Sequence, residues 1–164
     1  MAQAMYDFVP ADPADKPGLY RDLADAVRAI TDGECDGVAN MANCAALLAE
    51  FLPDLNWAGF YRMVDGELVL GPFVGRPACI RIPLGKGVCG TAAAEARSVL
   101  VEDVHAFPGH IACDAASRSE LVVPITRSGV VIAVIDLDSP RHARFDADDQ
   151  AGIEAMAAIL SDRI

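Results

Sequence analysis

The feature that most constrains the fold of this chain is the spacing of its apolar residues, which changes from a helical to a strand-like period and back again. Helical spacing over residues 17–30, with acids and arginines between the apolar positions, predicts an amphipathic helix. The apolar positions of this segment are Leu19, Leu23, Val27 and Ile30. A second helix is predicted over residues 34–52, ending before Pro53, and a last one over residues 146–162.

Strand-like spacing begins at Trp57. The runs 57–61 and 67–74 flank Asp65-Gly66, a dipeptide typical of the two-residue turn of a β-hairpin. The stretch 103–118 is rich in Pro, Gly, His and Asp and is predicted to be a loop, the kind of segment that often carries function. Further strands are predicted over residues 79–82, 98–101, 121–126 and 129–138, with a short helix over residues 91–96.

No internal repeat or linker interrupts this order, and 164 residues suffice for one hydrophobic core. We predict an α+β fold in which helices pack on an antiparallel sheet. Residues 1–16 are expected to form a loose arm that precedes a single domain at residues 17–164.

The charge balance argues against a nucleic-acid partner. The formal net charge is −11, and the basic residues are spread singly instead of forming the cluster that binds phosphates. No uncharged apolar run approaches the ~20 residues of a membrane span, and the N-terminus has no secretory signal pattern. We therefore expect a cytoplasmic protein with a small-molecule or protein partner and no membrane association.

Three of the five cysteines lie in the second half of the chain, at Cys79, Cys89 and Cys113. Zinc sites commonly pair their ligands as C-x2-4-C, whereas these thiols are 10 and 24 residues apart. We therefore predict no metal site and no cofactor, and thiol redox chemistry is the first hypothesis, because a nucleophile and its resolving thiol need only spatial closeness. Cys35 and Cys44 are expected to be core or incidental residues.

Three carboxylates are expected to gather on one face of the sheet. Asp136 and Asp138 are two residues apart in a predicted strand and so share a face, with Ile135 and Leu137 on the other. Glu120 reaches the same space if its strand pairs with theirs. Because ionised acids repel one another, at least one pKa should rise and that acid should keep its proton near neutral pH.

Two aromatic residues and two histidines are further candidates. Trp57 and Tyr61 are four apart in a strand and share a face, where they either form the wall of a pocket or belong to the core. His105 and His110 have no partner acid or histidine at i+3 or i+4, so structural hydrogen bonding is the favoured role for both.

Six motifs in chain order closely resemble the free methionine-(R)-sulfoxide reductases, a family of GAF domains, from about residue 18 to the C-terminus. The motifs are Asn56-Trp-Ala-Gly-Phe-Tyr61, Leu70-Gly-Pro-Phe-Val-Gly75 with Ala78-Cys79, Gly85-Lys-Gly-Val-Cys-Gly90, Val104-His-Ala-Phe-Pro-Gly-His-Ile-Ala-Cys-Asp114, Ser119-Glu120 and Ile135-Asp-Leu-Asp-Ser-Pro140. The resemblance implies a six-stranded antiparallel GAF sheet, flanked by helices, with a buried pocket.

The resemblance also implies an enzyme that reduces free L-methionine-(R)-sulfoxide. In this reading Cys113 is the catalytic cysteine, Cys79 resolves its sulfenic acid as a disulfide, and Cys89 has a secondary resolving role. It further implies thioredoxin as the reductant and a homodimeric assembly.

The acids and aromatics fit that chemistry. A thiol attacking a sulfoxide expels the oxygen only if that oxygen is protonated, so we assign Glu120 and Asp138 as proton holders. Asp136 is assigned to the substrate ammonium, and Trp57 and Tyr61 to its methyl and thioether groups.

Two other classes of function remain open. A GAF-type sensor would bind a small ligand without turnover, since a fold does not fix a function, but it has no need of a cysteine pair. A zinc-stabilised binding module would use Cys79, Cys89, His110 and Cys113.

Overall fold

The computed structural model describes residues 8–10, 12–111 and 114–164. Its centre is a six-stranded sheet with strand order β3-β2-β1-β6-β5-β4, in which every neighbouring pair is antiparallel. The strands are β1 (Trp57–Val64), β2 (Glu67–Gly75), β3 (Arg81–Pro83), β4 (Val99–Val101), β5 (Ser119–Arg127) and β6 (Val130–Ser139). The predicted α+β fold with six antiparallel strands is confirmed.

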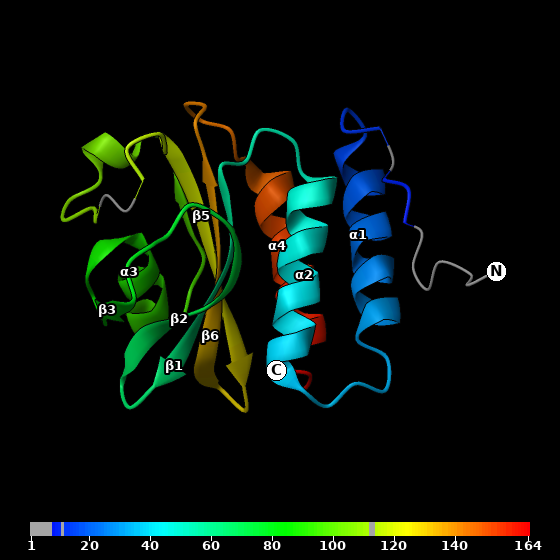
Figure 1. Ribbon diagram of the computed structural model, residues 1–164. Coiled ribbons are helices and arrows are strands. Elements are labelled where there is room, and N and C mark those ends of the chain that lie inside the picture. The colour runs from blue at the N-terminus through cyan, green and yellow to red at the C-terminus, as the bar shows by residue number, and fades with distance from the viewer. Residues whose placement is uncertain (1–7, 11, 112–113) are drawn as a thin grey trace.

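The helices lie in layers on either side of the sheet (Figure 1). Helices α2 (Gly37–Phe51) and α4 (Ala147–Leu160) cover one face, and α1 (Lys16–Ile30) packs against them from outside. The short α3 (Gly87–Glu95) and a 3-10 turn at Val104–Ala106 lie on the other face. None of the helices in the described ranges is long and apolar enough to cross a membrane.

Each face of the sheet has its own core, because strand residues alternate between faces. The larger core is formed by the three long helices and the side chains of Phe60, Ile135 and Leu137, all fully buried. The smaller core lies under α3 and includes Trp57, Tyr61 and Cys89. The predicted placement of Ile135 and Leu137 away from Asp136 and Asp138 agrees with this division.

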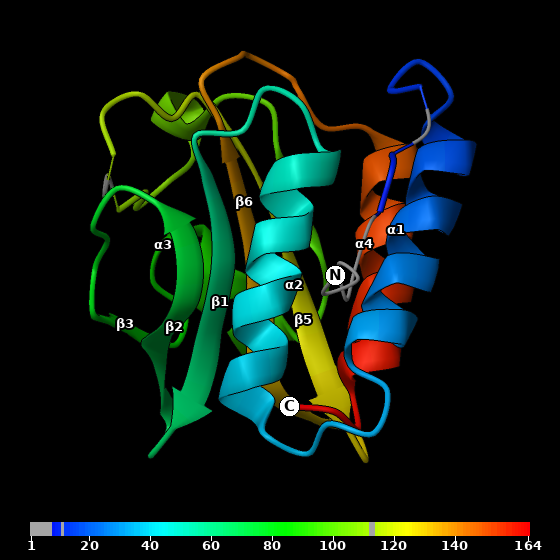
Figure 2. The ribbon, with the colours of Figure 1, turned by 45° about the vertical axis from the view of Figure 1, so that its right-hand side comes forward.

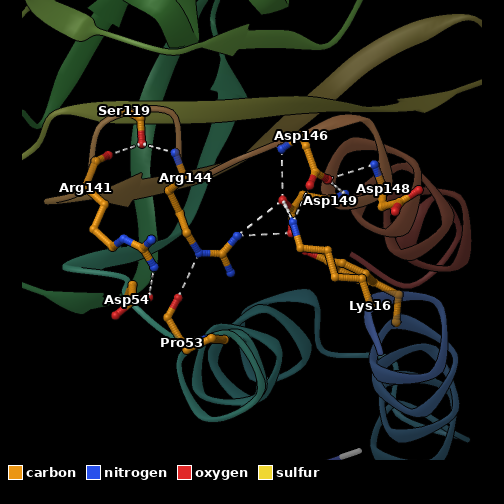
Figure 3. A network of polar contacts seen from close by, with 10 residues as sticks. Lys16, Pro53, Asp54, Ser119, Arg141, Arg144, Asp146, Asp148 and Asp149 are labelled. Carbon is orange, nitrogen blue, oxygen red and sulfur yellow. Dashed lines mark hydrogen bonds and ion pairs between the residues drawn. The ribbon is translucent and has the colours of Figure 1, made fainter. Parts of the chain in front are cut away.

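Buried ion pairs fix the N-terminal end of α4 (Figure 3). The carboxylate of Asp149, which is 1% exposed, binds Lys16 Nζ at 2.7 Å, Arg144 Nη1 at 3.2 Å and the Tyr20 hydroxyl at 2.8 Å. Asp146 caps the helix by accepting from the backbone N–H groups of Asp148 and Asp149. The loop before α4 is thereby joined to α1.

Two element boundaries differ from the sequence prediction in a way that matters for function. Helix α3 begins at Gly87 and not at residue 91, because Gly85 and Gly87 take positive φ angles of 77° and 61° and turn the chain into the helix early. Strand β5 begins at Ser119, so Glu120 lies inside the paired strand and not at its mouth. Both changes bring side chains into the same pocket.

Candidate active site

A cavity lies on the α3 face of the sheet, where strands β1, β5 and β6 meet α3 and the loop 103–118. It encloses about 550 Å³ of empty space, part of it open to solvent. Its lining comprises Trp57, Tyr61, Arg76, Pro77, Ala78, Ile82, Lys86, Gly87, Val88, Cys89, His110, Ile111, Asp114, Ser117, Glu120, Asp136 and Asp138. Each of the six sequence motifs thus contributes at least one residue to this cavity.

The three predicted acids all line this cavity. Glu120 on β5 is directly paired with Asp138 on β6, and Asp136 lies two residues further along the same face. Glu120 and Asp136 are each 6% exposed. The expectation that the final hairpin gathers its carboxylates agrees with this register.

Burial raises the pKa of all three acids. For Glu120 the pKa lies well above its ordinary value because of burial first and the charges of Asp136 and Asp138 second. The pKa of Asp138 is raised well above its ordinary value by burial and by Asp136. For Asp136 burial raises the pKa to about 6, while hydrogen bonding to Cys89 and Glu120 acts in the opposite direction. Among the three acids, Asp136 is therefore the most readily ionised, while Glu120 and Asp138 favour their protonated forms.

The carboxylate of Asp136 is incompletely satisfied. Its Oδ1 is buried and has no hydrogen-bond partner among the residues that the structure describes. A buried unpaired anion is costly, so an arrangement of this kind points to a positively charged or hydrogen-donating ligand.

Cys89 lies beside two of these acids. Its Sγ is 4.0 Å from Glu120 Oε1. The Cys89 Sγ, one carboxyl oxygen of Glu120 and one of Asp136 all lie within 4.8 Å of one another. The zinc-module alternative drew instead on Cys79, Cys89, His110 and Cys113. The pKa of Cys89 is raised well above its ordinary value by burial first and by the charges of Asp136 and Glu120 second.

The aromatic residues form one wall of the cavity. Trp57 stacks on Tyr61 with ring centroids 5.9 Å apart, and on Phe73 at 5.2 Å. The indole N–H donates to the Arg76 carbonyl at 3.1 Å, and the Tyr61 hydroxyl donates to the Cys79 carbonyl at 3.0 Å. These bonds tie the wall to the segment that contains Cys79.

The chain matches a family model, described as a GAF domain, over residues 40–164. It is 49% identical to the free methionine-R-sulfoxide reductase of Escherichia coli over 146 residues, covering 89% of this chain and 88% of that protein. A solved structure of the Neisseria meningitidis free methionine-R-sulfoxide reductase, in complex with its substrate, superposes with a TM-score of 0.89 at 45% identity, covering 96% of this chain and 93% of that one. A Burkholderia vietnamiensis protein described as a candidate GAF sensor has a TM-score of 0.87 at 52% identity, covering 93% and 96%.

This chain belongs to the free methionine-R-sulfoxide reductase family of GAF domains. The membership confirms the family and the enzyme class that the sequence motifs indicated.

The structure describes four of the five cysteines, which differ in burial and in whether they line the cavity. Cys113, the predicted nucleophile, lies outside the described residues, although its neighbours Ile111 and Asp114 line the cavity. Cys79 is half-buried and packs against the smaller core. Cys35 is exposed and Cys44 is buried in α2, and neither lines the cavity, which agrees with their expected minor roles.

His110 is a cavity residue that the sequence analysis assigned to structural hydrogen bonding. Its Nε2 lies 3.8 Å from Glu120 Oε2, and burial lowers its pKa, which favours the neutral ring. The partner is 10 residues away in the sequence, and a search for helical spacing could not find it.

Asn56 is a second residue that sequence reasoning passed over. Its Nδ2 donates to Asp114 Oδ2 at 3.1 Å and to Ser117 Oγ at 3.0 Å. These bonds join the residue before β1 to the end of the 103–118 loop. Asp114 also accepts a hydrogen bond from the Ala116 N–H, and this bond, followed by the one from Asn56, lowers the pKa of Asp114. The position of Asn56 directly before Trp57, in the first motif, was the available signal.

Proposed function

We propose that this protein reduces free L-methionine-(R)-sulfoxide to methionine by cysteine sulfenic acid chemistry. The observation that carries the proposal is the cluster of three buried acids in the cavity, of which Asp136 is the most readily ionised while Glu120 and Asp138 favour their protonated forms. The Escherichia coli and Neisseria meningitidis relatives are named free methionine-R-sulfoxide reductases, and the cavity supplies the groups that this chemistry requires.

The reaction needs an acid at the sulfoxide oxygen. The sulfur of Cys113 attacks the sulfoxide sulfur and forms an S–S bond as the S–O bond breaks and the oxygen leaves as water. A water molecule then adds to the Cys113 sulfur and breaks the S–S bond, which releases the thioether, returns a proton and leaves Cys113 as the sulfenic acid. The oxygen can leave the substrate only in protonated form, and Glu120 and Asp138, whose protonated forms are favoured, are assigned as the donors. Their raised pKa values make them donors.

The free amino acid is recognised by its charge. With a pKa of about 6, Asp136 is mainly ionised at neutral pH. Its Oδ1, which has no hydrogen-bond partner among the described residues, accepts a hydrogen bond from the substrate ammonium group. A peptide-bound methionine sulfoxide has an amide at this position and cannot make the ion pair. Trp57 and Tyr61 provide the apolar wall for the methyl and thioether groups.

The catalytic cycle closes through a disulfide. The Cys79 thiol attacks the Cys113 sulfenic acid, which releases water and leaves a Cys79–Cys113 disulfide, and an external dithiol such as thioredoxin reduces it. The Cys79 sulfur is disulfide-bonded in this structure, which supports a redox-active role for it. A cytoplasmic location and a homodimeric assembly complete the proposal.

A coupled assay with thioredoxin, thioredoxin reductase and NADPH tests this function. Wild type should reduce free methionine-(R)-sulfoxide and leave the S epimer unchanged, and Cys113→Ser should be inactive because sulfur is the required nucleophile. Cys79→Ser should release about one methionine per chain and then stall. Binding of the substrate by wild type without any turnover would contradict the proposal and favour the sensor alternative.

A further inference from the structure

Cys89 has no step in the proposed reaction, although its thiol lies beside two of the cavity acids. It is the third residue of α3, is 4% exposed and is a free thiol. The next residue, Gly90, packs so tightly that an added Cβ would lie 2.4 Å from the Pro83 carbonyl oxygen. The start of α3 is thus fixed against the turn before it, and the direction of the Cys89 side chain is fixed with it.

Cys89 approaches the acids from the helix side of the cavity, opposite the sheet. Glu120 and Asp136 project from the sheet, whereas Cys89 projects from the helix above it, with Sγ 4.0 Å from Glu120 Oε1. The Cys89 Sγ and one carboxyl oxygen of each acid lie within 4.8 Å of one another. A thiol in this position can donate its S–H to a carboxylate, as a weak hydrogen bond.

We propose that Cys89 is a positioning residue whose S–H group orients the Asp136 and Glu120 carboxyl groups, and that it takes no part in thiol–disulfide exchange. The inference rests on the proposed function, because it concerns the acids that the function assigns to the substrate. It replaces the secondary resolving role that the family resemblance implied for this thiol.

The protonation of the cluster supports the positioning role. Burial, and then the charges of Asp136 and Glu120, raise the pKa of Cys89 well above its ordinary value. A thiol reacts as its thiolate, so at neutral pH Cys89 is a poor nucleophile. The same proton makes it a donor.

The donor has a specific consequence for Asp136. A hydrogen bond to the ionised form of an acid favours that form. The Cys89 Sγ lies within 4.8 Å of an Asp136 carboxyl oxygen as well as 4.0 Å from Glu120 Oε1, so its single S–H can turn to either acid, and its hydrogen bonding lowers the pKa of Asp136 against the effect of burial. Cys89 therefore helps Asp136 to be the most readily ionised of the three acids. The other titratable or charged groups that line the cavity are Tyr61, Arg76, Lys86, His110 and Asp114.

The test compares Cys89→Ala, which lacks the donor, with Cys89→Ser, which restores one as a hydroxyl. Carboxyl 13C NMR measures the titration midpoint of the Asp136 carboxyl group. In Cys89→Ala this midpoint should lie about one pH unit higher than in wild type, which is the shift expected when a charged group loses one hydrogen bond. KM for free methionine-(R)-sulfoxide near pH 6.5 should rise several-fold with little change in kcat. Cys89→Ser should return both values toward wild type.

Cys44 provides the matched control. It is also a buried free thiol, and burial raises its pKa to about 12, but it lies in α2 away from the cavity acids. Cys44→Ala and Cys44→Ser should leave the Asp136 midpoint and KM unchanged. Circular dichroism would verify that each variant is folded.

Two results would overturn the inference. One is an Asp136 midpoint that is the same in wild type, Cys89→Ala and Cys89→Ser. The other is an equal loss of thioredoxin-driven turnover in both variants, since a redox thiol is replaced no better by serine than by alanine. The titration midpoint measured by NMR does not depend on catalysis. If wild type were inactive but the Asp136 midpoint still depended on Cys89, the proposed function would be rejected and the positioning role of Cys89 would stand.

Discussion

At the scale of single residues, Asp136 shows a conflict between stability and function. Its side chain is buried, its pKa of about 6 favours the ionised form at pH 7, and its Oδ1 has no hydrogen-bond partner among the described residues. This is unfavourable for folding, yet the same oxygen is available to a cationic ligand. Fold stability alone would favour a neutral residue here. The proposed ammonium pair explains why an acid occupies the position.

Asp136→Asn should stabilise the fold and weaken substrate binding. Removing the buried charge should raise the unfolding free energy at pH 7 by ~1 kcal/mol or more, which corresponds to ~2–4 °C in Tm. KM for the free amino acid should rise steeply, because losing a desolvated ion pair typically costs ~2–5 kcal/mol. Thermal unfolding and steady-state kinetics measure the two effects.

The exposed Asp22 on α1 serves as the control, and Asp22→Asn should change neither value. N-acetyl-methionine-(R)-sulfoxide, which lacks the ammonium, should be a poor substrate for wild type and should be affected little by Asp136→Asn. Equal use of the acetylated and free substrates by wild type would contradict the ammonium pair.

At the scale of elements, the position of β6 and α4 depends on the loop between them. Ser119 at the start of β5 accepts from the Arg144 N–H at 3.3 Å and donates to the Arg141 carbonyl at 2.6 Å, as Figure 3 shows. Arg144 then binds the buried Asp149 and the Pro53 carbonyl. Since Ser119 precedes Glu120, the network holds the cavity strand and the helical layer in a fixed relation.

Asp149→Ala should be strongly destabilising. It leaves Arg144, whose side chain is 7% exposed, without its carboxylate, and breaking a buried pair in this way typically costs ~3–5 kcal/mol. Asp25→Ala breaks the exposed i,i+3 pair with Arg28 and should cost less than ~0.5 kcal/mol. Urea denaturation followed by circular dichroism measures the difference, and similar small losses in both variants would contradict a structural role for the network.

At the scale of the whole molecule, the cavity acids should determine how stability depends on pH. Their native pKa values are raised, so between about pH 4 and pH 7 the native state binds more protons than the unfolded state. Stability should therefore fall as pH rises through this range. His110, with a lowered pKa, acts in the opposite direction just below its ordinary value, but it is one group against three.

The unliganded protein should thus be most stable near pH 4–5 and less stable at pH 7. Below that optimum, stability should fall because the pKa of Asp146 is lowered to about 2, chiefly by its hydrogen bond from Lys16, and the pair is lost on protonation. Thermal unfolding at pH intervals from 3 to 8 gives the profile. Combining Glu120→Gln with Asp136→Asn should flatten the fall between pH 5 and 7, and an unchanged slope in this variant would assign the fall to other groups.

The sequence by itself determined the order of the elements and the family. Periodicity located the long helices and the strands, since burial on one face imposes a local spacing that can be counted. The Asp136-x-Asp138 spacing predicted a shared face because strand side chains alternate. The onsets of α3 and β5 were misplaced, since glycine φ angles and cross-strand pairing decide those boundaries, and the bounds of α2, β1 and β3 also differ by two or three residues.

Only the tertiary structure decided which residues meet and which of them keep their protons. The approach of Cys89 to Glu120 spans 31 residues, and that of His110 to the same acid spans 10, with no repeat or spacing to signal either contact. The protonation states depend on burial, which the sequence cannot measure. A pKa is a property of the folded environment, so the assignment of Asp136 as the ionised acid became available only once the strands and α3 had been placed around it.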